Sequence, residues 1–314
     1  MINIGLAFLF IVASLCLSYL PQNYLFMLAK SFNVQIMIGY ILLGLFLLFR
    51  KQWLVAVSCF ISASILFIYT NAQINLLNLN SANSPLRVYP EHSRMQRGAV
   101  SIAQFNILMY NTNYSATIKS ALSTNADLIS FQEINQKWAS ELEANLKEKY
   151  PYYKLLPQED LYGIGIFSKY PLSNINVLHF GKVPQIAANL KSSILNFHFF
   201  TIHTRSPETY ENHIVRNNQI NEVEKYLDSI PSPKFTIGDY NCVPWDVSII
   251  NFKKQSQLQD SRKSLCATFP TFFPPAMIPL DYIFYSKDVQ CVEFKTVDNG
   301  DSDHKGIIGK YLIR

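Results

Sequence analysis

The first 70 residues of this chain contain no acidic residue. All 22 Asp and Glu residues come later, beginning at Glu91, and the segment carries only three charged side chains, Lys30, Arg50 and Lys51. A soluble domain of this length needs charged side chains over its surface, so this composition excludes an ordinary soluble fold for the segment. A membrane anchor is the structure that such a composition favours.

The rest of the chain lacks a large excess of either charge. Removing those three cations from the 27 basic residues leaves 24, against 22 acidic residues, which is a net charge of about +2. The pI of the whole chain, near 8.8, is therefore no evidence for a nucleic-acid partner.

Cysteine is scarce and is not spaced for metal binding. Three of the five cysteines follow the apolar segment, namely Cys242, Cys266 and Cys291, and no C-x-x-C or paired Cys and His spacing occurs. This absence disfavours a zinc site. Three thiols permit at most one disulfide, and the sequence leaves both the free and the paired state open.

Three apolar runs fill the first 70 residues. Ile4 to Leu20, Val34 to Phe49 and Gln52 to Thr70 each approach the length that crosses a bilayer core of about 30 Å at 1.5 Å per helical residue. We interpret residues 1–70 as a membrane anchor with three transmembrane helices. A cleaved signal peptide is the alternative for the first run, but that run lacks a basic start and a small-x-small cleavage site.

Arg50 and Lys51 lie in the shortest loop between two predicted spans. Because cytoplasmic loops are enriched in Lys and Arg, we expect this loop and the N-terminus in the cytoplasm, and everything after Thr70 outside it. Lys30, in the opposite loop, is the charge that opposes this orientation. The sequence therefore predicts a multi-pass protein of the inner (cytoplasmic) membrane, with its soluble part on the extracytoplasmic side.

Residues 71–98 are rich in Asn, Ser and Pro, and we interpret them as a linker. From Ala99 onwards, short apolar runs typical of strands alternate with helical periods, which indicates one mixed α and β domain over residues 99–314. Strands are expected at 99–105, 127–132, 164–168, 187–191, 194–203, 234–237, 280–285 and 306–309, and helices at 114–123, 135–150, 211–229 and 246–252.

Polar side chains recur where these apolar strands end. Any one of them is more often a loop or capping residue, but their recurrence indicates a shared site. Several hard oxygen donors with few soft ligands suit Mg²⁺ or Mn²⁺, with Ca²⁺ also open. The positions are Asn106, Glu133, His203, Asp239, Asn241, Asp281, Asp303 and His304.

The chain resembles the endonuclease/exonuclease/phosphatase superfamily, which includes DNase I-like nucleases, neutral sphingomyelinases and inositol-phosphate phosphatases, and most of all its bacterial membrane-anchored members. The resemblance rests on six motifs in family order: Gln104-Phe105-Asn106, Phe131-Gln132-Glu133, Gly165-Ile166-Phe167-Ser168-Lys169-Tyr170-Pro171, Gly238-Asp239-Tyr240-Asn241, Leu280-Asp281-Tyr282 and Ser302-Asp303-His304. It implies an α+β fold, a four-layer α/β/β/α sandwich over residues 99–314, preceded by the three transmembrane helices.

The resemblance also implies metal-dependent hydrolysis of a phosphate ester. Glu133 is then expected to hold the Mg²⁺ or Mn²⁺ ion with help from Asn106, and Asp303 to complete or orient that site. Asp239 and Asn241 are expected to position the attacking water and a phosphate oxygen.

The two histidines of the set have implied roles as well. His304, oriented by Asp281, is expected to act either as general base or as a cationic contact to the phosphate. His203 is expected to place a second imidazole against the phosphate. A non-catalytic binding domain would be expected to have lost Glu133, Asp239 or His304, and all three are present.

The substrate class stays open between two phosphodiesters. Nucleic acid is favoured over phospholipid because nucleases are common in the family. A sphingomyelinase-like lipid phosphodiesterase is the alternative, because the spans hold the domain near a bilayer and Phe269, Phe272, Phe273 and Met277 lie in a Pro-rich loop that could touch it. A phosphomonoesterase is less favoured, and no feature indicates a protein partner.

Overall fold

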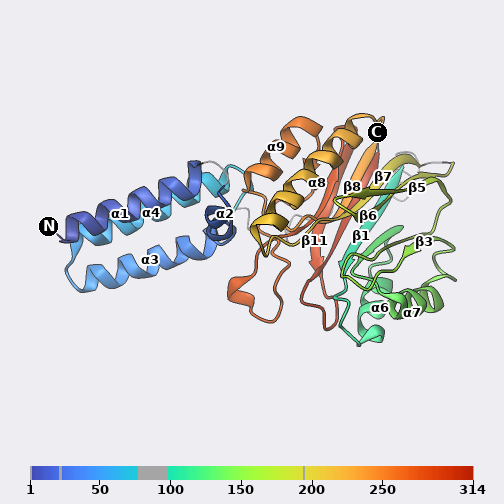
Figure 1. Cartoon of the computed structure of the whole chain (residues 1–314), viewed down its shortest axis with the longest axis horizontal. Helices are drawn as coiled ribbons and strands as arrows, with labels where there is room; N and C mark the ends of the chain where they lie inside the picture. The colour runs from blue at the N-terminus through green and yellow to red at the C-terminus, as the bar shows by residue number, and fades with distance from the viewer. Residues whose placement is uncertain (1, 21–22, 77–97, 194, 314) are drawn as a thin grey trace.

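The structure is a computed structural model that describes residues 2–20, 23–76, 98–193 and 195–313. An elongated helical bundle built from the N-terminal segment projects from one end of a compact two-sheet domain (Figure 1). Most of the predicted linker, residues 77–97, lies outside the described residues.

Two six-stranded sheets pack face to face in the domain. The first runs in the order β11 (Val289–Val297), β12 (Gly306–Ile313), β1 (Ala99–Asn106), β2 (Leu128–Gln132), β4 (Ile164–Ser168) and β3 (Tyr152–Leu156). The second runs in the order β5 (Leu172–Phe180), β6 (Val183–Lys191), β7 (Asn196–His203), β8 (Lys234–Asp239), β10 (Asp281–Tyr285) and β9 (Gln259–Asp260).

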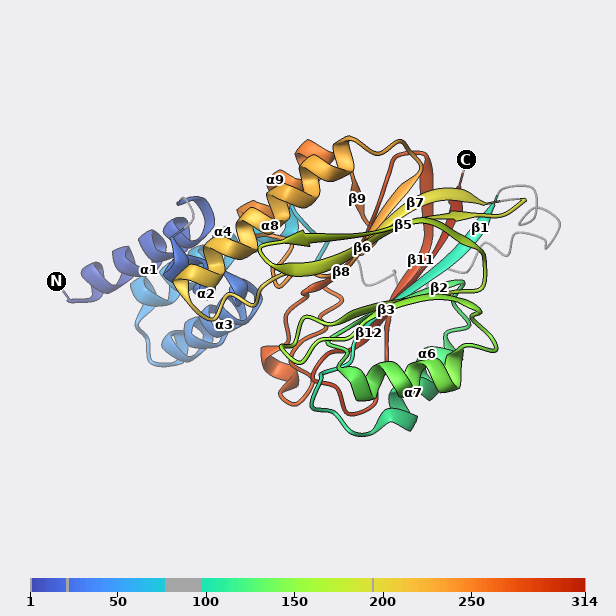
Figure 2. The same ribbon diagram turned by 45° about the vertical axis from the view of Figure 1, so that its right-hand side comes forward.

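Helices cover the two outer faces (Figure 2). Trp138 and Leu142, on α7 (Gln136–Leu146), pack with residues of α6 (Tyr114–Ser123) against the first sheet. Val223 of α8 (Tyr210–Asp228) and Ile249 of α9 (Val247–Ser256) pack against the second sheet. Apolar residues from the inner faces of both sheets form a separate core between them. The predicted α+β sandwich is confirmed.

Four strands, β3, β5, β9 and β11, are absent from the sequence-based expectation. Most residues of β5 are exposed, and β11 alternates only weakly between buried and exposed positions. All four are the edge strands of the two sheets, where one side of the strand has no neighbour and no continuous apolar run is needed. Their pairing is decided by the neighbouring strand rather than by their own composition.

Gly238 allows the two central strands of the second sheet to come together beside the polar strand ends. Its φ is +145°, and a Cβ there would lie 1.8 Å from the carbonyl oxygen of Ile202 on β7. Only glycine adopts this conformation without strain. The glycine therefore sets the position of Asp239, which follows it, relative to His203 at the end of β7.

The N-terminal segment contains four helices where the sequence predicts three. They are α1 (Ile2–Tyr19), α2 (Tyr24–Ser31), α3 (Asn33–Phe49) and α4 (Trp53–Asn71). The unpredicted one, α2, begins where the Asn23 side chain accepts a hydrogen bond from Leu25 N at 2.9 Å.

The prediction of three transmembrane helices is corrected by the lengths of these elements. Among the described residues, α4 alone is long and apolar enough to cross a bilayer, and α1 meets the criterion only together with α2, which is bent from it by 99°. The third helix, α3, has 17 residues. Apolar composition is visible in the sequence, but it does not determine where each helix begins and ends. The described residues therefore contain one candidate span, or two if the bent pair counts as one.

Candidate active site

The polar strand ends predicted from the sequence meet at one edge of the sandwich. In the second sheet, His203 at the end of β7 pairs with Asp239 at the end of β8, and Asp281 at the start of β10 pairs with Asp239 from the other side. In the first sheet, Asn106 ends β1, and Glu133 directly follows the neighbouring strand β2. Two separate sheets therefore supply the site.

The loop before β12 brings His304 to this edge. The Ser302 hydroxyl donates to the carbonyl oxygen of Asn106 at 2.7 Å and accepts from His304 N at 3.1 Å. The Asn299 amide donates to the carbonyl oxygens of both Asn106 (2.6 Å) and His304 (3.0 Å). These bonds fix the backbone of His304 against the end of β1.

His304 forms a buried pair with Asp281. Its Nδ1 lies 2.9 Å from Asp281 Oδ2, while the Gln104 amide donates to the other carboxylate oxygen at 2.8 Å. Burial disfavours the charged ring, but the carboxylates of Asp281 and Asp239 outweigh it and raise the pKa of His304 to about 10. His304 is therefore an imidazolium at neutral pH.

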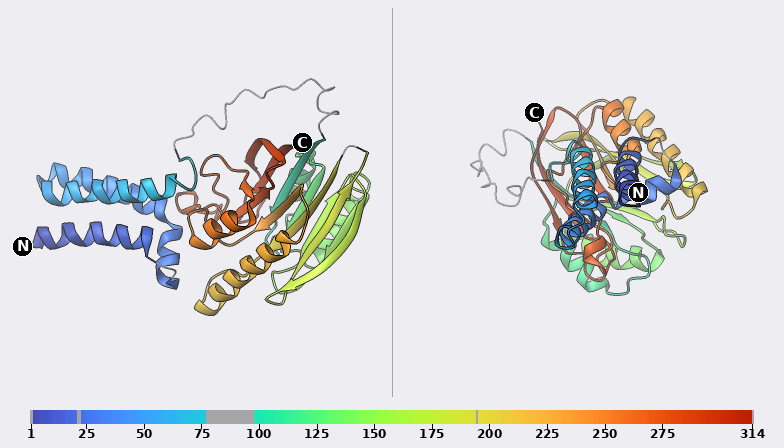
Figure 3. Two further views of the ribbon diagram at one scale, coloured as in Figure 1. Left: turned by 90° about the horizontal axis from the view of Figure 1, so that it is seen from above. Right: turned by 90° about the vertical axis from the view of Figure 1, so that its left-hand side faces the viewer.

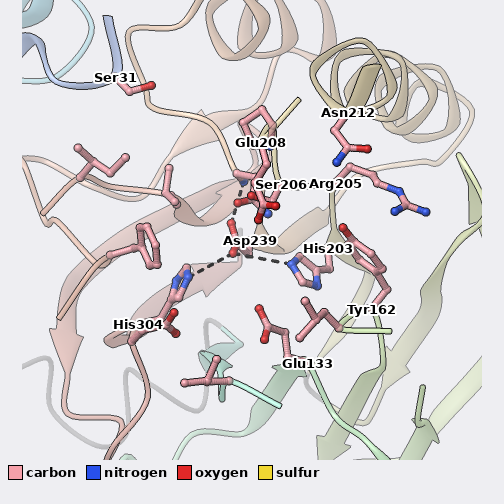
Figure 4. A pocket seen from close by; sticks show the side chains of 18 of the residues that line it. Ser31, Glu133, Tyr162, His203, Arg205, Ser206, Glu208, Asn212, Asp239 and His304 are labelled. Atoms are coloured by element: carbon pink, nitrogen blue, oxygen red, sulfur yellow. Dashed lines mark hydrogen bonds and ion pairs between the residues drawn. The ribbon is translucent and has the colours of Figure 1, made fainter. Parts of the chain in front are cut away.

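Asp239 lies between two imidazole rings that differ in charge, those of His304 and His203 (Figure 4). Its Oδ2 is 3.7 Å from His304 Nε2 and 3.9 Å from His203 Nε2. Burial, followed by the positive charge of His304, lowers the pKa of His203 to about 3, so this ring is neutral. Burial and the nearby charge of Asp281 raise the pKa of Asp239. The backbone N–H of Asn241 donates to Asp239 Oδ1 at 2.7 Å.

Glu133 and Asp303 have the properties of metal ligands. Glu133 accepts hydrogen bonds from the Asn106 amide at 2.9 Å and from Met109 N at 3.3 Å. Burial raises the pKa of the carboxyl groups of both Glu133 and Asp303. Asp303 Oδ1 is buried and has no hydrogen-bond partner among the described residues. A divalent cation would satisfy this oxygen and favour the ionised form of both acids, so the residues fit such an ion.

The Asn106 amide links Glu133 to Asp239, and Asp239 belongs to a second group of possible metal ligands. The Asn106 amide nitrogen also donates to Asp239 Oδ2 at 3.2 Å, and its oxygen accepts from Leu108 N at 3.2 Å. In this arrangement Asn106 orients the two carboxylates. Ligand atoms of Asp239, Asp281 and His304 lie within 4.8 Å of one another, but the Asp281 and His304 atoms are already paired.

A cavity of about 590 Å³ opens over these residues. Six of the eight predicted site residues line it, while Asn106 and Asp281 are fully buried behind the others. The six lining residues are Glu133, His203, Asp239, Asn241, Asp303 and His304.

Sequence reasoning did not place three further residues, Tyr162, Arg205 and Phe269, at this cavity. Tyr162 lies beside the His203 ring at 5.2 Å, and the Arg205 guanidinium stacks on the Tyr162 ring at 4.7 Å. Phe269 packs on the His304 ring at 4.7 Å. The loops that carry these side chains have no sequence pattern that predicts their conformation.

Cys242, Cys266 and Cys291 are all free thiols, so the structure contains no disulfide among them, a point that the sequence left open.

The sequence profile of the Endonuclease/Exonuclease/phosphatase family matches residues 103–304, which is more than half of the chain and contains all eight site residues. The chain belongs to the endonuclease/exonuclease/phosphatase family. This match confirms the resemblance based on the six motifs. Members of the family are phosphoesterase hydrolases. No curated protein gave a match in a sequence comparison.

Solved structures of this family share the fold. A family protein from Bacteroides thetaiotaomicron is 16% identical, with a TM-score of 0.59 over 70% of this chain and 99% of its own. D. rerio TDP2 complexed with a single-strand DNA product is 18% identical, with a TM-score of 0.58 over 68% and 99%. Sphingomyelinase C from Streptomyces griseocarneus is 14% identical, with a TM-score of 0.53 over 68% and 99%. At these identities the likeness shows the fold alone.

Asp281→Asn is expected to lower the pKa of His304 well below its value of about 10, because the amide removes the nearest negative charge. The charged ring contributes stability below the pKa of an unfolded histidine, about 6.5, and that contribution is lost as pH rises through the folded pKa. In the variant, the stability that the charged His304 ring contributes should therefore be lost at a pH closer to neutral. NMR titration of the His304 ring would measure this. Asp228→Asn, on the exposed side of α8, should leave the titration unchanged. An unshifted His304 in Asp281→Asn would contradict the assignment.

Proposed function

We propose that this protein is a divalent-metal-dependent phosphodiesterase held at a membrane by its N-terminal helices. The observation that carries the chemistry is the juxtaposition of the Asp281–His304 pair, the Asp239 carboxylate and the unpartnered Asp303 oxygen at one pocket. A cation, an imidazolium and a carboxylate are the groups that phosphate ester hydrolysis needs.

Each group has a defined part in the reaction. Water attacks phosphorus opposite the leaving oxygen, so that one P–O bond forms and one breaks while the proton of the water passes to a base and then to the leaving group. Asp239, 3.7 Å from His304, is placed to orient the water and accept that proton. A divalent ion held by Glu133 and Asp303 supplies Lewis-acid charge when bound.

His304 contributes positive charge at the phosphate. Of its two roles left open by the sequence, the pKa of about 10 supports the cationic contact over the general base. Its ring stabilises charge on the nonbridging oxygens as the transition state forms. The neutral ring of His203 faces the same oxygens as a hydrogen-bond partner.

The membrane part of the proposal is supported by the surface of the helical bundle. Large apolar side chains are exposed along it, including Phe8 (70%), Leu42 (63%) and Phe49 (85%). An apolar surface of this extent is uncommon in water and typical of a helix surface that contacts lipid. We propose that α4 crosses the membrane and that the catalytic domain is on the extracytoplasmic side.

The chemical proposal is tested with two soluble esters and the full chain in detergent. Bis(p-nitrophenyl) phosphate is expected to be cleaved in Mg²⁺ or Mn²⁺, and faster than the monoester p-nitrophenyl phosphate. Turnover of the monoester alone would move the protein to the phosphatases. Absence of turnover of either ester would overturn the proposed function.

The orientation is tested by fusions after Ile74, in the turn that follows α4. Alkaline phosphatase is expected to be active there and green fluorescent protein dark, because the Arg50-Lys51 loop at the far end of α4 is held in the cytoplasm. Fusions within the Arg50-Lys51 loop should give the opposite pair of signals. A fluorescent, phosphatase-negative pair after Ile74 would place the catalytic domain in the cytoplasm.

A further inference from the structure

Helix α2 forms one wall of the active-site pocket. Met27, Leu28, Ser31 and Phe32 line the same cavity as the catalytic residues, and Figure 4 shows Ser31 across the pocket from Glu133. All four wall residues precede the range that matches the family profile, which begins at residue 103. The domain shared with the family therefore does not complete this pocket by itself.

Directional hydrogen bonds hold α2 against the catalytic domain. The Tyr24 hydroxyl donates to the Glu208 carbonyl oxygen at 2.6 Å at one end of the helix. Near the other end, the buried Trp245 indole donates to the Lys30 carbonyl oxygen at 2.7 Å. The Tyr69 hydroxyl of α4 donates to the Trp245 carbonyl oxygen at 2.9 Å. The wall is therefore a built part of the structure and connects the bundle to the site.

The orientation of α2 places this wall at the base of the bundle. Its axis is turned 99° from that of α1, and it crosses the junction between bundle and sandwich (Figure 3). The apolar side chains of α2 lie on two different faces, because Leu28 lines the pocket, whereas Leu25 is 71% exposed and does not line it. If the bundle is in a membrane, α2 lies along the membrane surface with the pocket beside it.

The loop around η2 (Pro274–Ala276) adds exposed apolar side chains at the same junction. Phe272 and Phe273 are 78% and 55% exposed. The Gln35 amide of α3 donates to the Met277 carbonyl oxygen at 2.9 Å, which fixes this loop against the bundle. The loop identified in the sequence as a candidate apolar rim thus lies next to the proposed membrane surface.

The charges of the pocket suit a single phosphate group. Among its lining residues in the described part of the chain, Arg205 is the one Lys or Arg, and Asp160 and Glu208 add negative charge beside it. A polynucleotide carries a phosphate at every residue and is bound by several cations. One phosphodiester attached to an apolar group fits this combination of charges and apolar wall better.

We infer that the substrate is a phospholipid of the membrane in which the protein is anchored. Its phosphodiester lies against Asp239 and His304, and its apolar part contacts Leu28 of α2 and Phe32, which directly follows that helix. One P–O ester bond is replaced by a bond to the oxygen of water, and the leaving oxygen takes up the proton. This inference rests on the proposed phosphodiesterase function and assigns its substrate class and a specificity-determining wall.

The test compares the cleavage of two substrates by the parent chain and by three variants in or directly after α2. The full chain is assayed on vesicles of phosphatidylethanolamine and phosphatidylglycerol and on bis(p-nitrophenyl) phosphate. Leu28→Ser is expected to lower the ratio of lipid to bis-ester kcat/KM roughly tenfold, since it removes an apolar contact that only the lipid makes. Leu25→Ser, the same change one turn away and outside the pocket, should alter that ratio less than about twofold. Phe32→Ser repeats the test at a second wall position.

The outcomes separate this inference from the proposed function. Metal-dependent cleavage of the bis-ester without cleavage of lipid would overturn the lipid assignment and leave the phosphodiesterase function standing. Faster cleavage of single-stranded DNA or RNA than of lipid would do the same, as would an unchanged ratio in both folded wall variants. Failure to cleave any ester would overturn both.

Discussion

His304→Ala is expected to lower kcat on bis(p-nitrophenyl) phosphate by about a thousandfold or more, which corresponds to roughly 4 kcal/mol of transition-state stabilisation. The ring is held 2.9 Å from Asp281 and 3.7 Å from Asp239, and it is the imidazolium of the site. Alanine removes the positive charge that offsets the negative charge developing on the phosphate. Single-turnover and steady-state rates in saturating Mg²⁺ would measure the loss.

The control for this variant is His179→Ala. His179 lies on the edge strand β5, is exposed and does not line the pocket, so the rate should stay within about twofold of the parent. Because His304→Ala leaves the buried Asp281 carboxylate without its partner, His304→Gln and thermal unfolding curves are needed to separate lost folding from lost chemistry. A folded His304→Ala protein with more than about a tenth of the parental kcat would refute the role given to this ring.

Removal of divalent cations is expected to abolish hydrolysis, with full recovery on adding Mg²⁺ or Mn²⁺. The acids Glu133 and Asp303 are half-buried at the pocket, and Asp303 Oδ1 is unpartnered among the described residues, so a bound cation would stabilise their charged forms. Activity after EDTA treatment, and again after titration with each metal, gives the measurement. Full activity in EDTA would refute the metal assignment.

Glu133→Gln refines this prediction. The amide keeps the shape of the side chain but loses the charge, so a higher metal concentration, about tenfold or more, should be needed for half-maximal activity. Glu148→Gln makes the same change at an exposed position beyond α7 and should leave the metal dependence unchanged. Equal metal dependence in the two variants would show that Glu133 is not a ligand.

The local elements of the catalytic domain were largely predictable. The strand at 164–168 and the helix at 114–123 have the predicted bounds, because a short buried strand is a continuous apolar run and an amphipathic helix repeats at 3.6 residues. Edge strands such as β5 were not predictable, since their exposed residues carry no such run. The extra helix α2 depends on the Asn23 cap and on contacts with residues almost 200 positions away, which no local pattern contains.

The sequence by itself determined which residues are candidates for the site, through polar residues at the ends of apolar strands and six motifs in family order. Their arrangement was decided by the tertiary structure alone. Asp239 and Asp281 come from adjacent strands and His304 from the other sheet, and burial among these charges is what makes His304 cationic and His203 neutral. The pocket wall was likewise decided by packing, because the bonds that dock Tyr24 and Lys30 join segments 184 and 215 residues apart. Such contacts depend on the fold that brings both segments together, and neither segment alone encodes them.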